Sequence, residues 1–349
     1  MTTDFHAHYV PLPVADFLRA RRTVPRIETL ADGSERLLMP AGNLVFDSAY
    51  TDIDARLAFM DEIDVRRQLL SLPGLFGIDS LPLDQSRSPT CAFNDEVATV
   101  CRRYPDRFLG LAALPFADMD AAIAELGRAR KELGLIGAIV PVNAFASLAE
   151  AEKMSPLFEA GDKLGCHFFI HPGRRPDEAL RTLANDGAAP LLDSDNTMQR
   201  RALGVQADVG QAMVTLLFTD FLDRYPHVSV HVANLGGTLP AVIERMDHTV
   251  RARTPGMPLP SERVRRVYVD CSSLGPRTLE LAVAIYGADR IVLGTDCPIF
   301  RSDWTLGAIR QARLGEAERS AILSGNAKRL LARFELASTE ISRNTETAQ

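Results

Sequence analysis

Eight short runs of β-branched and apolar residues alternate along this chain with longer segments of helical periodicity. Strands that alternate with helices of about 10–15 residues form βαβ units and a parallel sheet. Eight such units in 349 residues predict an α/β fold, a (β/α)8 TIM barrel, rather than an open doubly wound sheet. No Gly-x-Gly-x-x-Gly motif follows an early run, which argues against dinucleotide binding. The expected strands are residues 3–8, 65–72, 108–114, 135–142, 166–171, 228–233, 267–271 and 290–295.

Two segments interrupt this alternation. Residues 15–50 are rich in turn-forming residues, and we expect a small cap inserted after the first strand, over the barrel mouth. Residues 173–208 are rich in Arg, Asp, Gly and Pro, and predict a long irregular loop. The polar, aperiodic residues 336–349 predict a flexible tail. We therefore expect one barrel domain over residues 1–335, with both insertions inside it.

A His-x-His pair stands at the end of the first expected strand. His6 and His8 share one strand face, because side chains alternate with a period of two. His171 ends the fifth expected strand, and Asp296 follows the eighth. In a TIM barrel all these strand ends reach the same mouth. Three imidazoles and one carboxylate suit a single divalent ion, with Zn2+ as the expected metal and Mn2+ or Fe2+ as alternatives.

Composition excludes several classes of function. The net charge is −6 and no Lys/Arg-rich block is present, so we expect no nucleic-acid partner. No apolar run has the length of a membrane span, and the N-terminus carries no basic-then-apolar signal, so we expect no membrane partner. The five cysteines are odd in number and lack Cys-x-x-Cys spacing, which predicts reduced thiols and a cytoplasmic protein.

Five motifs spread over nearly the whole chain resemble the amidohydrolase superfamily, in the branch typified by aminocarboxymuconate-semialdehyde decarboxylase. This resemblance implies metal-dependent decarboxylases, with some hydrolases and hydratases on the same scaffold, and it implies a homodimer. It also places His6, His8, His171 and Asp296 at the metal-ligand positions. The expected fourth strand has no lysine that could bridge two metals, which favours one ion. The motifs are Asp4-Phe5-His6-Ala7-His8, Tyr104-Pro105-Asp106-Arg107-Phe108, His171-Pro172, Asn234-Leu235-Gly236-Gly237-Thr238-Leu239-Pro240 and Gly294-Thr295-Asp296-Cys297-Pro298.

One position departs from the family pattern. The Leu-Gly-Gly turn after the sixth strand is normally preceded by an acid/base histidine, and this chain has Asn234 there. Asparagine can orient a water or a substrate oxygen, but it cannot transfer a proton near neutral pH. His231, three residues earlier, is expected on the opposite strand face unless a bulge intervenes.

Three residues are candidates for substrate binding. Arg245 lies eleven residues after Asn234, the spacing of an arginine that relatives lend to the neighbouring subunit. A guanidinium binds a carboxylate in bidentate fashion, so Arg245 and Arg174 would suit a small carboxylated substrate. Trp304, the one tryptophan, follows the eighth strand and would line the pocket. Each of the three could instead be an ordinary surface or packing residue.

Three functions remain open from the sequence. The first is metal-dependent decarboxylation of an aromatic or unsaturated carboxylic acid, with Asp296 and Asn234 as catalytic residues. The second is hydrolysis of an ester, lactone, amide or activated carbon–carbon bond, with Asp296 as the base. The third is a catalytically inactive, metal-binding relative, and Asn234 is the only feature that favours it. Retention of all four ligands argues against it, since an inactive site need not keep them.

Overall fold

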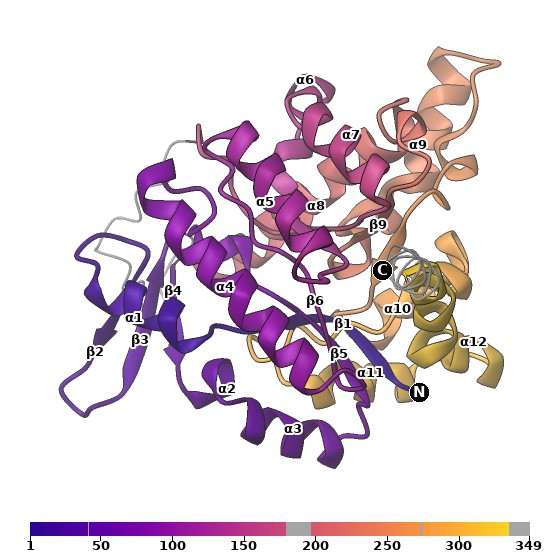
Figure 1. Ribbon diagram of the computed structural model, residues 1–349. Helices are drawn as coiled ribbons and strands as arrows, with labels where there is room; N and C mark the ends of the chain where they lie inside the picture. Colours follow the sequence, from indigo (N-terminus) through magenta and orange to yellow (C-terminus); the bar gives the residue numbers. More distant parts are fainter. Residues whose placement is uncertain (41, 179–196, 273, 335–349) are drawn as a thin grey trace, which may run out of the picture.

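The computed structural model describes residues 1–40, 42–178, 197–272 and 274–334 of the chain. All eight expected strands are present and run parallel to their neighbours. Figure 1 shows the helices arranged around them. The strands are β1 (Thr3–His8), β5 (Arg67–Ser71), β6 (Phe108–Gly110), β7 (Gly137–Pro141), β8 (His167–His171), β9 (Ser229–Val232), β10 (Tyr268–Asp270) and β11 (Ile291–Val292).

The strands form two sheets, β1-β5-β6 and β11-β10-β9-β8-β7, which two backbone seams join into a barrel. At one seam Ala112 bridges Ala138, so that β6 meets β7. At the other seam Phe5 N donates to Leu293 O at 2.8 Å, and Ala7 bridges Cys297. The predicted (β/α)8 barrel is therefore confirmed.

Most helices lie outside the barrel and bury one face against it. They are α1 (Leu12–Ala20), α2 (Ser48–Thr51), α3 (Ile53–Glu62), α4 (Leu83–Arg103), α5 (Met119–Lys131), α6 (Leu148–Glu152), α7 (Ser155–Leu164), α8 (Thr197–Phe218), α9 (Leu239–Arg253), α10 (Pro276–Tyr286), α11 (Ser302–Gln311) and α12 (Glu316–Ser320). The chain is also helical over residues 326–334. Among the described helices, none combines the length and apolar character that crossing a bilayer requires.

The insertion after β1 is a small antiparallel sheet of β2 (Arg26–Thr29), β3 (Glu35–Met39) and β4 (Gly42–Phe46). It lies to one side of the barrel in Figure 1, next to α1. Pro40 packs against Gly77 in the loop that follows β5 at the mouth. A small insertion after the first strand is thus present, as expected, and its Pro40 reaches the loop at the mouth.

The expectation of an irregular loop over 173–208 is wrong for its last part. Residues 197–208 form the first half of α8 and are largely polar. The second half packs against the barrel through its buried residues Val209, Ala212, Met213 and Leu216, and the helix extends from there toward its N-terminus. Residues 179–196 of the insertion and the expected tail at 336–349 lie outside the described residues.

Two apolar layers build the core. The larger layer fills the space between strands and helices. The smaller layer lies inside the barrel, where Phe5, Leu69, Leu111, Ile139 and Phe169 point inward. Leu330, Leu331 and Phe334 of the last helical stretch join this inner layer. The barrel is thus filled with side chains, and polar groups can gather at the carboxyl ends of its strands.

Candidate metal centre

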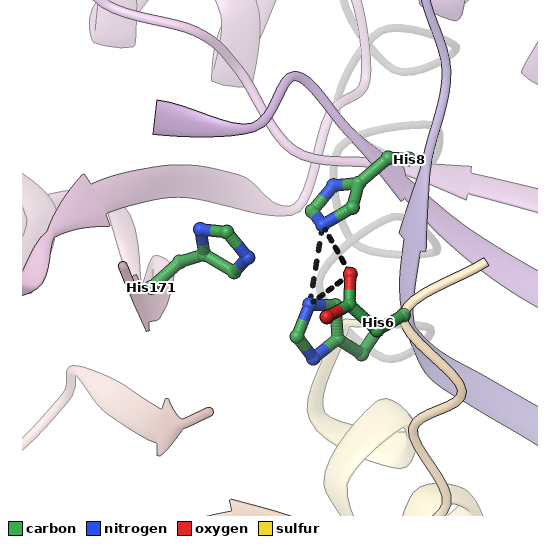
Figure 2. A group of neighbouring side chains, drawn as sticks. His6, His8 and His171 are labelled. Carbon is green, nitrogen blue, oxygen red and sulfur yellow. Dashed lines mark hydrogen bonds and ion pairs between the residues drawn. The ribbon is translucent and has the colours of Figure 1, made fainter. Parts of the chain in front are cut away.

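Four buried side chains from distant parts of the chain converge at the barrel mouth. His6 and His8 stand two residues apart on β1, as period-two alternation requires, and His171 is the last residue of β8. Asp296 follows β11 in a turn with a φ of 59°, and its backbone N donates to His6 O at 2.7 Å. One nitrogen or oxygen atom of each lies within 4.8 Å of the others. Figure 2 shows His171 facing His6 and His8.

The contacts inside this group are short. His6 Nε2 lies 3.2 Å from His8 Nε2. Asp296 Oδ1 is 3.3 Å from His6 Nε2 and 3.1 Å from His8 Nε2. Among the described residues, Asp296 Oδ1 has no hydrogen-bond partner although it is buried. A buried carboxylate oxygen without a partner destabilises a protein unless a cation compensates it.

Each histidine binds an outer partner through Nδ1. His6 Nδ1 lies 3.0 Å from Asp270 Oδ2, and His171 Nδ1 lies 2.8 Å from the carbonyl oxygen of Pro172. Both partners can only accept, so both Nδ1 atoms carry the hydrogen. His8 Nδ1 is 3.1 Å from Ser71 Oγ, whose own proton goes to the carbonyl of Ala7.

Because Nδ1 is the protonated nitrogen, the neutral form of each ring presents Nε2 as a lone pair to the others. Outer hydrogen bonds of this kind fix the tautomer that binds metal. Three lone pairs and a carboxylate that face one another repel in the absence of positive charge. The group therefore has the donor chemistry of a site for one divalent cation.

The charges around the group favour a cation. Burial lowers the pKa of His8, and it lowers the pKa of His171 well below its usual range, so both rings are neutral, the form that binds metal. Burial also opposes charge on His6, but Asp270 and Asp296 raise its pKa overall. Burial raises the pKa of Asp296, yet His6 and His8 hold it well below its usual range. Asp296 is consequently a carboxylate at neutral pH.

Comparison with known proteins fits this geometry. The profile of a family described as Amidohydrolase matches residues 3–333. The chain belongs to the amidohydrolase family. It is 29% identical over 300 residues to 2-amino-3-carboxymuconate-6-semialdehyde decarboxylase of Dictyostelium discoideum, covering 82% of this chain and 78% of the relative. It is also 29% identical over 324 residues to gamma-resorcylate decarboxylase of a Polaromonas species, covering 85% of this chain and 95% of the relative.

A solved structure shares the fold of this amidohydrolase. The dihydroxybenzoic acid decarboxylase of a Polaromonas species, with bound manganese and the inhibitor 2-nitroresorcinol, matches with a TM-score of 0.68. The match covers 96% of this chain and 97% of that chain at 23% identity.

Asn234, the second predicted catalytic residue of this amidohydrolase, lies next to the metal group. Asn234 lies after β9 with a φ of 57°, is 8% exposed, and accepts a 2.5 Å hydrogen bond from Ser272 Oγ at its Oδ1. Its backbone N donates to Asp270 Oδ1 at 3.2 Å, so it shares a partner with His6. Asn234 is thereby joined to the metal group through Asp270.

The three predicted substrate-binding residues lie nearer the surface. Arg174 is half-buried, three residues after His171, and donates to the carbonyl of Glu178. Arg245 is exposed on α9. Trp304 is 57% exposed on α11, with its ring 6.4 Å from that of Phe300. Within this single chain, none of these three forms a described contact with the four converging side chains.

Sequence reasoning missed Asp270 and misplaced His231. Asp270 ends β10 at the mouth, and an acidic residue at the end of a barrel strand was a signal that could have identified it. His231 was expected to face away from the barrel interior. It is instead fully buried inside, stacked on Phe169, with Nε2 3.9 Å from Asp270 Oδ2. The prediction assumed that side chains alternate between the two faces from His231 to Asn234. It failed because β9 ends at Val232 and Asn234 has left-handed backbone geometry.

Proposed function

We propose that this amidohydrolase is a decarboxylase that removes CO2 from an aromatic or unsaturated carboxylic acid. The observation that carries the proposal is the buried set of three imidazoles and one carboxylate that converge at the barrel mouth. Relatives aligned over 82–85% of the chain are named for the decarboxylation of such acids. A small carboxylated molecule is therefore the proposed substrate.

His6, His8, His171 and Asp296 are proposed to hold one divalent ion, Zn2+ or Mn2+. The manganese in the Polaromonas structure supports Mn2+, and the nitrogen-rich donor set supports Zn2+. Such an ion, when bound, supplies Lewis acidity that polarises an oxygen of the substrate. The chain holds its ligands in place through Asp270, Ser71 and the Pro172 carbonyl.

Binding of the substrate carboxylate is assigned to arginine. Arg174 follows the strand that bears His171, and its guanidinium can bind a carboxylate in bidentate fashion. Arg245 is exposed on α9, which supports a role in the site of a second copy, in a homodimer. Trp304 offers an exposed aromatic face on α11, the helix that follows Asp296 in the chain. The five free cysteines support a cytoplasmic location.

Decarboxylation breaks the bond between the carboxyl carbon and its neighbour, and a proton must take the place of CO2 on that neighbour. Asn234 cannot donate this proton, but its buried amide can orient a water or a substrate oxygen. Asp296 is the other proposed catalytic residue, and its buried carboxylate lies beside the histidines at which the bond would break.

Hydrolysis is the second candidate, and Asn234 in place of an acid/base histidine is the observation that favours it. In that reaction Asp296 would accept a proton from the attacking water. In the metal-free protein burial raises the pKa of Asp296 and the two histidines His6 and His8 lower it, so Asp296 is a carboxylate. The aligned relatives are named as decarboxylases, which ranks hydrolysis below decarboxylation.

Metal content and CO2 release test the proposal together. Wild-type protein is expected to bind about one equivalent of Zn2+ or Mn2+ per chain. It is also expected to release CO2 from at least one member of a panel of carboxylated aromatic acids, such as 2,6-dihydroxybenzoate. His8→Ala and Asp296→Ala should abolish both, since each removes a ligand. Arg245→Ala should retain the metal and raise KM by about 10-fold or more, the loss of one buried ion pair.

Three results would contradict the proposal. A wild type that takes up no added metal contradicts the site. Turnover of esters or lactones without CO2 release favours the hydrolase. Metal binding without turnover of any panel member favours an inactive relative.

A further inference from the structure

A second pair of histidines lies inside the barrel, apart from the four converging side chains. His167 begins β8 and His231 lies on β9, and both are fully buried. Their rings lie side by side and nearly coplanar, with centroids 4.9 Å apart, and His167 Nε2 is 2.7 Å from His231 Nδ1. His167 Nδ1 lies 2.9 Å from Ser229 Oγ. Three polar groups thus form a hydrogen-bonded chain in the barrel interior.

The far end of this chain is His231 Nε2. It has no hydrogen-bond partner among the described residues. Phe169 stacks on the ring at 3.9 Å, and Phe5 meets it edge-on at 5.8 Å. Asp270 Oδ2 lies 3.9 Å from the nitrogen. A polar nitrogen in an apolar setting is unfavourable unless a nearby acceptor compensates it. The Asp270 carboxylate and the backbone of Phe5, which also interacts with this ring, are acceptors near His231.

The position of each hydrogen follows from the charges. Burial lowers the pKa of His167 to about 3 and that of His231 well below its usual range, so each neutral ring carries one hydrogen. A bare lone pair on His231 Nε2 would point at a carboxylate, which is repulsive. The hydrogen therefore sits on His231 Nε2. His167 donates to His231, and Ser229 donates to His167.

The same carboxylate oxygen also holds a proposed metal ligand. Asp270 Oδ2 accepts from His6 Nδ1 at 3.0 Å, so it lies between His6 and His231. The other oxygen, Oδ1, accepts from the backbone N of Ser272 at 3.0 Å and of Asn234 at 3.2 Å. Asp270 thus accepts hydrogen bonds from one histidine ring and two backbone N–H groups, and these contacts fix the direction in which its carboxylate faces.

We propose that His231 is a positioning residue, whose Nε2–H stabilises the Asp270 carboxylate and thereby keeps His6 Nε2 free to bind metal. The inference rests on the proposed metal site. It assigns a function to the buried pair that the site geometry leaves unexplained. His231 acts through Asp270 and His6, and contacts no substrate.

Three substitutions at His231 separate this role from simple packing. His231→Gln places an amide N–H near the position of Nε2 and so retains the donor to Asp270. His231→Asn places its amide near Nδ1, and can pair only with His167. His231→Phe keeps the ring stacked on Phe169 and removes both nitrogens. The dissociation constant of Mn2+ is measured from the electron paramagnetic resonance signal of the free ion in titrations of the metal-free proteins.

The expected order of affinity distinguishes the variants. Loss of a direct partner of a metal-binding histidine weakens metal affinity by about 10- to 100-fold. Because His231 acts one step further out, His231→Asn and His231→Phe should weaken Mn2+ binding by about 3- to 10-fold. His231→Gln should stay within about twofold of wild type. Melting temperatures of the metal-free proteins report packing separately.

The outcomes separate this inference from the function on which it rests. Equal Mn2+ affinity in wild type, His231→Gln and His231→Asn overturns the inference and leaves the metal site intact. A lower melting temperature with unchanged affinity assigns His231 to packing alone. A wild type that binds no Mn2+, like His8→Ala, overturns the metal site itself. If His231→Phe does not fold, the difference in Mn2+ affinity between His231→Gln and His231→Asn still tests the inference.

Discussion

Asp79 is a buried carboxyl group outside the metal cluster, in the loop that follows β5. It is 4% exposed, and its Oδ1 has no hydrogen-bond partner among the described residues. Burial raises its pKa to about 8, although the Arg174 guanidinium partly opposes this. In the folded protein Asp79 therefore keeps its proton at a pH where the unfolded chain, with an ordinary pKa of about 4, has lost it.

This difference predicts a pH dependence of stability. The folded state binds one more proton than the unfolded state between about pH 4 and about pH 8, so this contribution falls as the pH rises through that window. Asp79→Asn stays neutral and should be more stable than wild type by about 1–3 kcal/mol near pH 9. The two should converge only at about pH 3, below the pKa of the unfolded chain. Urea unfolding at both pH values measures this.

Asp106→Asn, at an exposed position, is the matched control for Asp79→Asn. It should follow the wild-type stability curve. Parallel curves for Asp79→Asn and wild type across the window would show that Asp79 is ionised when folded.

At the scale of elements, the barrel depends on the contact between its first and last strands. Asp4 on β1 accepts from Thr295 N at 3.0 Å and from Thr295 Oγ1 at 2.7 Å, and these residues are 291 positions apart. Gln68 on β5 donates to the same carboxylate at 3.1 Å. Asp4 thus connects three neighbouring parts of the barrel beneath the metal group.

Removal of one donor to Asp4 should weaken this contact. Thr295→Val keeps the shape of the side chain but leaves Asp4 Oδ2 without its shortest partner. We expect a loss of about 1–2 kcal/mol in the free energy of unfolding, measured by urea titration. Thr295→Ser retains the hydroxyl and should lose less. A Val variant as stable as the Ser variant would contradict the assigned role of this hydrogen bond.

The elements also show what the sequence could and could not predict. His6 and His8 were predicted to share a face because strand alternation depends only on parity, and they do share it. The same rule failed for His231, because the positive φ of Asn234 interrupts the alternation after Val232 and side-chain patterns do not encode it. The start of α8 at Thr197 was missed because its first turns are polar and depend on packing further along the helix.

At the scale of the whole molecule, the four converging side chains connect regions that are distant in sequence. His6 and His8 come from β1, His171 from β8 and Asp296 from the turn after β11. A ligand that binds only the folded state stabilises it by about 2.7 kcal/mol at 100 times its dissociation constant. A bound ion should therefore stabilise the entire barrel.

Removal of the metal is expected to lower the melting temperature by about 3–8 °C. Dialysis against a chelator followed by differential scanning calorimetry tests this, and added Mn2+ or Zn2+ should restore the original value. His8→Ala, which lacks one ligand, should melt at the same temperature with and without chelator. A chelator effect of equal size in both proteins would place the stabilising ion elsewhere.

The seam between β1 and the turn that bears Asp296 also constrains the synthesis of the protein. While a ribosome makes the chain, the Asp4 carboxylate and the pair His6 and His8 emerge long before Thr295 and Asp296, since Asp4 and Thr295 are 291 positions apart. Until then β1 lacks one of its two neighbours, and the ligand set is incomplete. The nascent chain can therefore neither close its barrel nor complete its ligand set before Asp296 has been added and has left the ribosome.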